Sequence, residues 1–369
     1  MAGTDRTHLP ALAAAEASSL APATPDPATA AVLAALAAAA QQHLQDIRPA
    51  KTTSGYARDW ALWQQYLDWL AAPERTGHRL PDTAVTTGTL TGFVVWLDQV
   101  QVAAPNTIDR RITGVTVTAR QLGAEVPKAA TQAARAALKP LKLDKTRTAR
   151  GRGQAVPTSP AHLRAMGTAP TLIPRPEGSR RRRPDYEQPA LARLRDRALN
   201  TLSFAIAGRA SEVSALDDAG IVLADEGLVV DVPSVKGRPG RTVAVAYGQH
   251  PDSCPVRCWI AWQQAKRAAG APEHGAAFAA VDQWGRLGGR LSPDGCRIVI
   301  TRTAERAQLP VRLTGHSQRA GLITTSTKAG KRQDKVRQQS GHSAASPVFH
   351  GYVRDAQRWE DAATDGIGL

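Results

Sequence analysis

The sequence predicts a mainly α-helical chain with a small antiparallel sheet, built as a helical domain followed by a mixed α/β domain. Apolar residues recur at three- and four-residue steps through most of both halves, which is the period of an α-helix. Short β-forming runs alternate with turn residues between 220 and 247. A length of 369 residues exceeds that of one typical domain. We expect a disordered or partly helical arm over 1–40, a helical domain over 41–145, a basic linker over 146–157 and a second domain over 158–369.

The composition is strongly basic. Lysines and arginines number 47 against 32 aspartates and glutamates, a formal charge of +15, and the isoelectric point is near 10.3. This excess favours a polyanionic partner, nucleic acid or a membrane surface, over a small acidic substrate. No apolar run reaches the ~18 residues of a membrane span, and no signal peptide is recognisable. Three cysteines suit a reducing compartment. We therefore expect a cytoplasmic protein that binds nucleic acid.

The first half carries helix signals along most of its length. Residues 1–27 are rich in Ala, Pro, Thr and Asp, which is typical of a disordered arm. Trp60, Trp63, Leu67 and Leu70 then recur at helical spacing and indicate an amphipathic helix with an aromatic core face. The helices expected in this half span residues 28–46, 51–70, 85–100, 104–123 and 129–143.

The segment 139–152 is basic, with Asp144 as its one acidic residue. Its cations are Lys139, Lys142, Lys145, Arg147, Arg150 and Arg152. A solvated tether between domains would have this composition. A linker that lies along the phosphates of DNA would have the same basic composition. A two-lobed protein that encircles a duplex must reach along a length of DNA, which favours this second interpretation.

The second half begins near residue 155 and combines helices with the sheet. A Pro-rich loop over 174–189 contains four consecutive arginines, for which disorder and contact with DNA are both open. These arginines are Arg180, Arg181, Arg182 and Arg183. The β-forming runs between 220 and 247 predict the antiparallel sheet. Helices are expected at 159–166, at 191–208, from Gly208 onward, at 254–270 and at 291–308.

Four residues near the C-terminus have the chemistry of a phosphate site. His316 and Arg319 are three residues apart, so both would project from one face of a helix. A guanidinium suits bidentate phosphate binding, and an imidazole can donate to a phosphate or carry protons near neutral pH. His342 adds a second imidazole, and Tyr352, ten residues further on, can supply a nucleophilic oxygen. The hypothesis is a basic pocket around one phosphate, attacked by one phenol.

From about residue 50 to the C-terminus the chain resembles the tyrosine recombinase, or phage integrase, family. The motifs of that family are, in order, an arginine, a hairpin lysine, H-x-x-R, a His or Trp, and a tyrosine. AGRASEV resembles the first, with Arg209 and the acidic Glu212, and VKGRPGRTVAV resembles the hairpin, with Lys236 as its lysine. GHSQRAGL contains H-x-x-R, SGHSAAS contains His342, and HGYVR contains Tyr352.

The resemblance implies a site-specific recombinase that cleaves and rejoins DNA. Arg209 and Arg319 would bind the non-bridging oxygens of one phosphodiester, with hydrogen bonds from His316 and His342. Tyr352 would attack and leave a 3′-phosphotyrosyl link, and His316 would be its general base.

The same resemblance implies two supporting roles. Lys236 would protonate the departing 5′-oxygen, and Glu212 would hold neighbouring groups in place. Arg238 and Arg241 are alternative phosphate contacts in the same hairpin. A purely structural role for Glu212 is also open.

Two features depart from the family pattern. His342 and Tyr352 are ten residues apart where many relatives have nine, and Pro347 lies between them. We therefore expect an irregular loop before the tyrosine. His350 is an alternative second imidazole, although the GHS context favours His342.

The family also implies an assembly. It suggests a C-shaped clamp, with a helical core-binding domain on one side of double-stranded DNA and the catalytic domain on the other. Four protomers would join two DNA sites, with accessory DNA-bending or directionality proteins as further partners, in the nucleoid. Residues 358–369 would be either a tail that packs on a neighbouring protomer or a frayed end. The scheme needs no ATP and no metal, so no cofactor is expected, and the sequence has no G-x-x-x-x-G-K-[ST] loop.

Three alternatives remain from the sequence. A type IB topoisomerase would use the same chemistry to relax supercoils, and a DNA-binding protein could keep the scaffold without cleaving. His250, Cys254 and Cys258 step by four residues as metal ligands can, but a fourth ligand is missing and ordinary packing is favoured.

Overall fold

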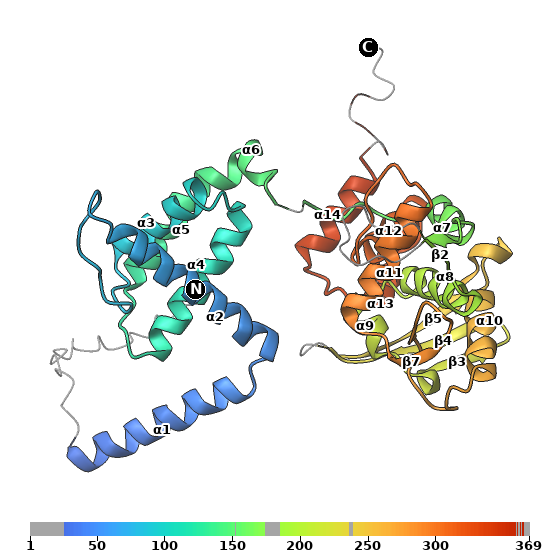
Figure 1. The fold of residues 1–369 in the computed structure, drawn as a ribbon, viewed down its shortest axis with the longest axis horizontal. Helices are drawn as coiled ribbons and strands as arrows, with labels where there is room; N and C mark the ends of the chain where they lie inside the picture. Colours follow the sequence, from blue (N-terminus) through green and yellow to red (C-terminus); the bar gives the residue numbers. More distant parts are fainter. Residues whose placement is uncertain are drawn as a thin grey trace, which may run out of the picture. The chain divides into compact units, whose positions relative to one another are not determined.

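The computed structural model describes residues 26–151, 153–173, 185–235 and 239–358, together with residues 360, 362 and 364. The chain forms two compact units, Met1–Gly151 and Arg152–Leu369 (Figure 1). The predicted clamp stays a prediction. Several residues singled out in the sequence lie outside the described residues: Arg152, Arg180, Arg181, Arg182, Arg183, Lys236 and Arg238.

The regular secondary structure in the described part of the first unit is all helical. Helix α2 packs on α4, and α5 packs on both α3 and α4. The helices are α1 (Pro27–Asp46), α2 (Ala50–Leu70), α3 (Thr87–Gln99), α4 (Pro105–Gln121), α5 (Lys128–Leu143) and α6 (Lys145–Thr148).

Aromatic rings fill the centre of the first unit. Trp63 is fully buried, and its ring meets the ring of Phe93 edge-on with centroids 5.3 Å apart. The Trp63 indole N–H donates to the main-chain oxygen of Asp82 at 2.8 Å, so the buried polar atom is satisfied. Leu67 is also fully buried. The apolar face predicted from the spacing of these residues is therefore the face that α2 turns to the core.

The basic residues at the end of the first unit are held by carboxylates. Asp98 on α3 is buried and accepts from Arg147 at 3.0 Å and from Arg150 at 2.7 Å. Lys142 pairs with Asp109 at 2.6 Å. The sequence pointed to Asp144 alone as an opposing charge, because the aspartates of α3 and α4 are far away along the chain. Residues 145–150 are thus attached to the helical unit.

The second unit combines helices with short antiparallel strands. Its helices are α7 (Pro160–Gly167), α8 (Ala190–Ala205), α9 (Ala210–Ala215), α10 (Pro255–Ala268), α11 (Pro293–Arg306), α12 (Ser317–Lys328), α13 (Gln333–Ser340) and α14 (Pro347–Ala356), with short 3₁₀ turns at Asp218–Gly220 and Pro251–Ser253. Its strands are β1 (Leu172–Ile173), β2 (Tyr186–Glu187), β3 (Ile221–Ala224), β4 (Gly227–Val232), β5 (Arg241–Ala246), β6 (Ala279–Val281) and β7 (Leu287–Arg290).

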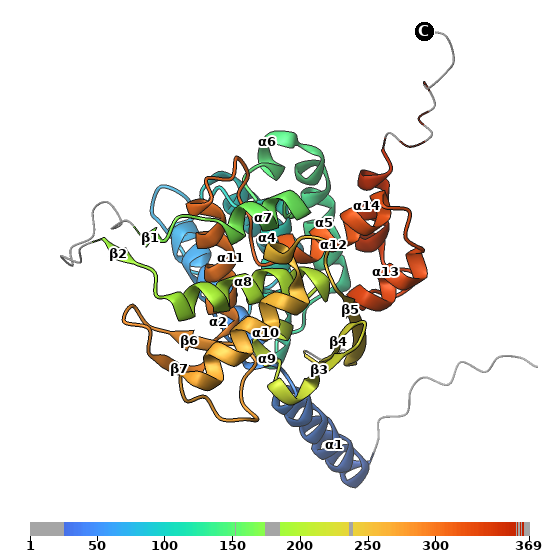
Figure 2. The ribbon, with the colours of Figure 1, turned by 90° about the vertical axis from the view of Figure 1, so that its right-hand side faces the viewer.

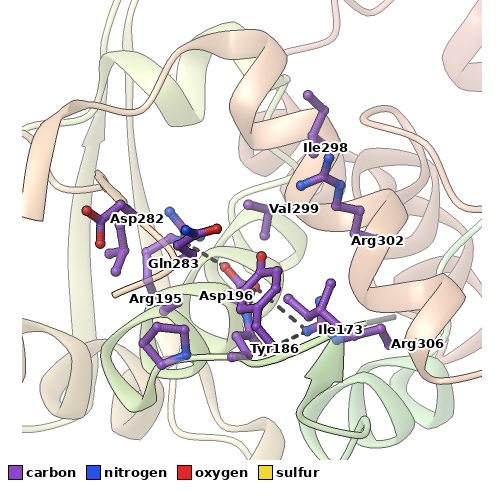
Figure 3. Close-up of a pocket in the computed structure, with 14 residues that line it drawn as sticks. Ile173, Tyr186, Arg195, Asp196, Asp282, Gln283, Ile298, Val299, Arg302 and Arg306 are labelled. Carbon is purple, nitrogen blue, oxygen red and sulfur yellow. Dashed lines mark hydrogen bonds and ion pairs between the residues drawn. The ribbon is translucent and has the colours of Figure 1, made fainter. Parts of the chain in front are cut away.

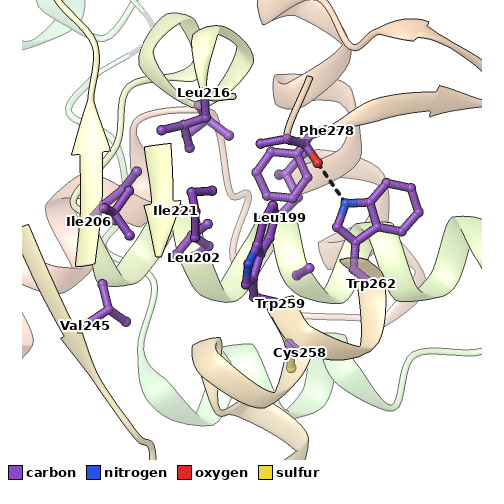
Figure 4. Packing of buried hydrophobic residues seen from close by; sticks show 14 of the residues in the cluster. Leu199, Leu202, Ile206, Leu216, Ile221, Val245, Cys258, Trp259, Trp262 and Phe278 are labelled. Carbon is purple, nitrogen blue, oxygen red and sulfur yellow. Dashed lines mark hydrogen bonds between the residues drawn. The ribbon is translucent and has the colours of Figure 1, made fainter. Parts of the chain in front are cut away.

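Helix α8 is the centre of the second unit. It packs against α10, α11 and α12, and Figure 2 shows α10 running beside it. Leu199 and Leu202 of α8 are fully buried against Trp259 and Trp262 of α10 (Figure 4). The Trp262 indole donates to the main-chain oxygen of Ala277 at 2.8 Å. The continuous apolar face of α8 predicted a buried helix, and α8 is buried on most of its surface, with polar residues such as Arg195, Asp196 and Asn200 buried as well.

The sheet has three antiparallel strands in the order β3-β4-β5. Val230 of β4 stands opposite Val243 of β5, and both are buried. The small antiparallel sheet and the mainly helical fold class are therefore confirmed. Two further strand pairs, β1–β2 and β6–β7, were not predicted, because each strand is only two to four residues long. Among the described residues, none of the helices has the length and apolar character that crossing a bilayer requires.

Candidate active site

The second unit contains a cavity of about 810 Å³ that brings together most of the predicted chemistry. Five predicted residues line it: Arg209, His316, Arg319, His342 and Tyr352. They come from four separate parts of the chain, spread over more than 140 residues. Gathering these side chains around one space is what the hypothesis of a phosphate pocket requires.

Arg209 is placed by the sharp end of α8. The helix stops at Ala205, and Ala207 then takes a left-handed conformation, with φ +48°, that turns the chain toward α9. Arg209 precedes the first residue of α9, and its side chain pairs with Glu212 one turn later. Glu212 also accepts the Arg209 main-chain N–H at 3.0 Å. The buried Glu212 carboxylate thus binds both the side chain and the main-chain N–H of Arg209, and so orients this arginine.

Arg319 is the most enclosed cation of the cavity. It lies in the first turn of α12 and is only 4% exposed. Its Nη1 donates to the main-chain oxygen of Ala207 at 2.8 Å, and its Nη2 lies 3.0 Å from Nε2 of His342. Burial and the positive charge of Arg209 lower the pKa of the Arg319 guanidinium to about 9. The site therefore holds crowded positive charge that an anion in the cavity would relieve.

His316 stands at the entrance to α12, directly before its first residue. The turn that carries it packs closely on α11: a Cβ built at Gly315 would lie 2.5 Å from Cγ of Arg297. Because only glycine fits this approach, the turn before His316 is locked against Arg297. Arg297 lines the cavity as well.

His342 follows α13 through Gly341, whose φ of +63° ends the helix in the left-handed conformation. Its Nδ1 lies 2.9 Å from the hydroxyl of Ser340. His350, the alternative imidazole, lies against the main-chain oxygen of Ala344 at 2.9 Å and does not line the cavity. The structure thus brings His342, and not His350, beside Arg319.

Tyr352 is presented by α14, which packs on α12. Burial raises the pKa of its phenol, against smaller opposing effects of the Arg319 charge and a hydrogen bond with Gln154. The segment before the tyrosine is irregular over residues 341–346, as expected, and becomes helical at Pro347. Pro347 is the first residue of α14, where proline is favoured, and Ser346 caps the helix by accepting from the N–H of Phe349 at 3.3 Å.

Arg241 is not among the residues that line the cavity. Its side chain is 12% exposed. The guanidinium donates to the main-chain oxygens of Gln339 and Ile206, each at 3.0 Å, and to Glu212 at 3.1 Å. Glu212 is buried, which raises its pKa, but hydrogen bonds from Arg241 and the Arg209 N–H outweigh burial and hold the pKa below its usual value. Glu212 is therefore a carboxylate between two arginines.

The predicted DNA contacts that the structure describes in the first unit are not among the residues that line this cavity. Lys139 and Lys145 are exposed on the first unit, while Lys142, Arg147 and Arg150 of that unit are paired with aspartates. Conversely, Gln154 and Arg297 line the cavity and were missed. Neither stands in a motif, and only the folding of α11 and of the segment after residue 152 brings them there.

A second cavity of about 110 Å³ shares no lining residue with the first (Figure 3). Four of its polar side chains bind one another. Asp196 accepts from Arg195 and from Gln188, each at 2.6 Å, and Gln188 in turn accepts from Arg306 at 3.0 Å. This arrangement is a buried structural network.

The cysteines suggested as metal ligands are packing residues in the structure. Cys254 accepts the N–H of Gly248 at 3.2 Å, and Cys258 donates to the main-chain oxygen of Asp252 at 3.6 Å. Across the part of the chain that the structure describes, no three His, Cys, Asp or Glu side chains are grouped so that they could hold a metal ion.

Several known proteins resemble this chain in sequence or in fold. No protein-family model matches the chain. An integrase/recombinase XerD homologue from Selenomonas ruminantium is 23% identical over 332 residues, which cover 88% of this chain and 87% of that protein. The Tn1549 transposon integrase in complex with transposon right end DNA superposes with a TM-score of 0.54 and 14% identity, over 87% of this chain and 96% of that one. The lambda integrase tetramer bound to a Holliday junction gives a TM-score of 0.52 and 15% identity, over 89% and 81%.

Proposed function

We propose, on the premise that this chain belongs to the tyrosine recombinase family, that it is a site-specific recombinase that cleaves and rejoins double-stranded DNA through a 3′-phosphotyrosyl intermediate. One observation carries the proposal. Arg209, His316, Arg319, His342 and Tyr352 all line one cavity, although they are spread over the second unit's sequence. The cavity therefore offers the guanidiniums of Arg209 and Arg319 and the two imidazoles to one phosphate, beside one phenol, and Arg297 lines it as well.

The proposed reaction is an in-line substitution at phosphorus. The guanidiniums of Arg209 and Arg319 bind the non-bridging oxygens and stabilise the charge that develops in the transition state. The Tyr352 oxygen forms a bond to phosphorus while the bond to the 5′-oxygen breaks. The products are a 3′-phosphotyrosyl link and a free 5′-hydroxyl.

Two protons must move in this step. Because burial raises the pKa of Tyr352, its phenol is protonated at neutral pH and must lose its proton as it attacks. We assign its removal to His316, and we assign a hydrogen bond to the phosphate to His342. Lys236, which lies outside the described residues, is proposed to protonate the departing 5′-oxygen. The link conserves the phosphodiester energy, so a 5′-hydroxyl of another strand reverses the attack and completes strand exchange.

The partner in this proposal is DNA. The net charge of +15 supports it, since neutralising phosphates releases counterions. The lambda integrase of the comparison is a tetramer on a Holliday junction. We propose the same assembly here, four protomers on two DNA sites.

The test is capture of the covalent link. A duplex is first selected from a random pool by binding to the Tyr352→Phe variant. It is then nicked next to each candidate phosphate, on its 3′ side, so that the short fragment with the new 5′-hydroxyl diffuses away after cleavage. The wild type should form a protein–DNA adduct that survives denaturing detergent. Tyr352→Phe should form none while its Kd for the duplex changes by less than about threefold.

The matched control is Tyr247→Phe, which removes the hydroxyl of an exposed tyrosine outside the cavity and should keep the adduct. No adduct from the wild type on any selected duplex would contradict the proposal. Relaxation of supercoiled plasmid without a preferred site would instead identify a topoisomerase.

A further inference from the structure

The C-terminal end of α8 binds three side chains from three other elements. The last carbonyls of a helix have no partner within the helix, and they carry its negative dipole end. Here the oxygen of Ala205 accepts from Gln339 at 2.8 Å, and that of Ile206 accepts from Arg241 at 3.0 Å. The oxygen of Ala207 accepts from Arg319 at 2.8 Å. Three consecutive carbonyls are thus capped by α13, β5 and α12.

Arg241 makes the largest number of these connections. It lies at the start of β5 and reaches residues 29, 35 and 98 positions away in the sequence. Its bonds to Ile206 and Glu212 fix the turn that carries Arg209. Its bond to Gln339 fixes the end of α13, two residues before Gly341.

The end of α13 is also packed tightly on the Arg241 side chain. A Cβ built at Gly341 would lie 3.2 Å from Cδ of Arg241, and Gly341 directly precedes His342. Gln339 strengthens the same joint by donating to Ala244 of β5 at 3.0 Å. One nearly buried guanidinium therefore touches the supports of both the first arginine and the second imidazole.

We propose that Arg241 is a positioning residue, which aligns Arg209 and His342 around the phosphate by joining β5, the end of α8, Glu212 and the end of α13. This inference rests on the proposed function and adds a residue that does not itself meet the DNA. A lysine cannot replace it fully, because only a guanidinium can donate in several directions within one plane. A shift of about 1 Å in a catalytic group is enough to slow a reaction ~10²-fold.

The test separates chemistry from DNA binding. Arg241→Gln should slow single-turnover adduct formation on the nicked duplex about 10²-fold, while the Kd for the duplex changes by less than about threefold. Arg241→Lys, which keeps the charge beside Glu212, should recover part of the rate. If Arg241→Gln does not fold, Gln339→Ala tests the same joint from the α13 side: it removes the side-chain bonds to the oxygens of Ala205 and Ala244, keeps the Arg241 bond to the Gln339 main-chain oxygen, and should slow the reaction about tenfold.

Arg195→Gln is the matched control. Arg195 is buried like Arg241, with 8% of its side chain exposed against 12%. It also donates to a carboxylate, that of Asp196, and to a main-chain oxygen, that of Ala279. It lies ten residues before the end of α8, about 15 Å along the helix. Its substitution should lower the melting temperature as Arg241→Gln does, and leave the rate of cleavage in the bound complex unchanged.

Two further readouts decide the mechanism. In a double-mutant cycle, Glu212→Gln and Arg241→Gln should be non-additive, because they break one chain of contacts. The dependence of log Kd on log salt should be unchanged in Arg241→Gln; a slope smaller by about one would mark Arg241 as a phosphate contact and overturn the proposal. So would an unchanged cleavage rate in a wild-type-like complex. If the wild type itself forms no adduct, the proposed function fails and this inference fails with it.

Discussion

The guanidinium of Arg319 lies against the imidazole of His342, with 3.0 Å between Nη2 and Nε2. A guanidinium can only donate, so this contact is a hydrogen bond when the ring nitrogen that faces Nη2 is the acceptor. The same guanidinium is anchored on the carbonyl of Ala207 at the end of α8. The cation is therefore fixed in position before any phosphate arrives, which is the condition for electrostatic catalysis without reorganisation.

We predict that Arg319→Lys slows adduct formation by at least about 10²-fold. Lysine keeps the charge, but it cannot hold the Ala207 carbonyl and a phosphate oxygen in one plane. Single-turnover capture on the nicked duplex measures the rate. A loss smaller than about threefold would show that the charge alone is sufficient.

Sulfate should bind in the cavity and stabilise the protein, because the positive charge around Arg319 is crowded there. At ten times a Kd of order 1 mM, the gain is about 1.4 kcal/mol, or roughly 2–4 °C in melting temperature. Sulfate also stabilises proteins by exclusion from their surface. The measure is thus the difference between the wild type and Arg319→Gln. An equal gain in both proteins would rule out the site.

Acid should remove a contribution of Glu212 to stability. Its pKa in the folded protein lies below the ordinary value of 4.5, so the stabilisation is present above about pH 4.5 and is lost as the pH falls through the lower, folded value. Urea unfolding from pH 3 to 7 should show Glu212→Gln less stable by about 1–3 kcal/mol at neutral pH. The difference should shrink below about pH 4.5. A difference that is constant with pH would contradict the assignment.

Two glycines should respond oppositely to alanine. A Cβ at Gly321 of α12 would lie 2.2 Å from the main-chain oxygen of Thr158 and 2.9 Å from the ring of Phe204, so Gly321→Ala should destabilise by about 1–3 kcal/mol. A Cβ at Gly351 of α14 would meet nothing within 4 Å. Gly351→Ala should therefore stabilise the DNA-free protein by about 0.5–1 kcal/mol. Chemical denaturation of the two variants tests both signs.

Asp98→Asn should loosen the end of the first unit. Arg147 and Arg150 share this buried carboxylate, and the amide leaves both with weaker partners. We expect a loss of about 1–3 kcal/mol and faster cleavage by trypsin after Arg147 and Arg150. Asp109→Asn, which weakens the partly exposed pairs of Asp109 with Lys142 and Arg135, is the control and should cost less than about 1 kcal/mol. Equal proteolysis of both variants would mean that Asp98 does not hold the segment.

Much of the fold could be predicted because its signals are local. The helical period of Trp63 and Leu67 identified the buried face of α2, and the alternation of Val230 and its neighbours indicated the sheet. The short pairs β1–β2 and β6–β7 escaped because two to four residues carry no measurable period. The candidate site was predicted from motif order, and its gathering in one cavity depends on α8, α12 and α14 packing together.

By itself the sequence determined the fold class, the family motifs and the chemical character of the cavity, since these depend on residue type and spacing along the chain. Only the tertiary structure decided what each cation contacts. Arg241 is a residue of the type that binds DNA, but its guanidinium binds groups inside the protein, because Ile206, Glu212 and Gln339 reach it from distant parts of the chain. His342 and His350 likewise differ in which neighbour each one meets. Such contacts are set by how helices and strands pack, and spacing along the sequence does not encode them.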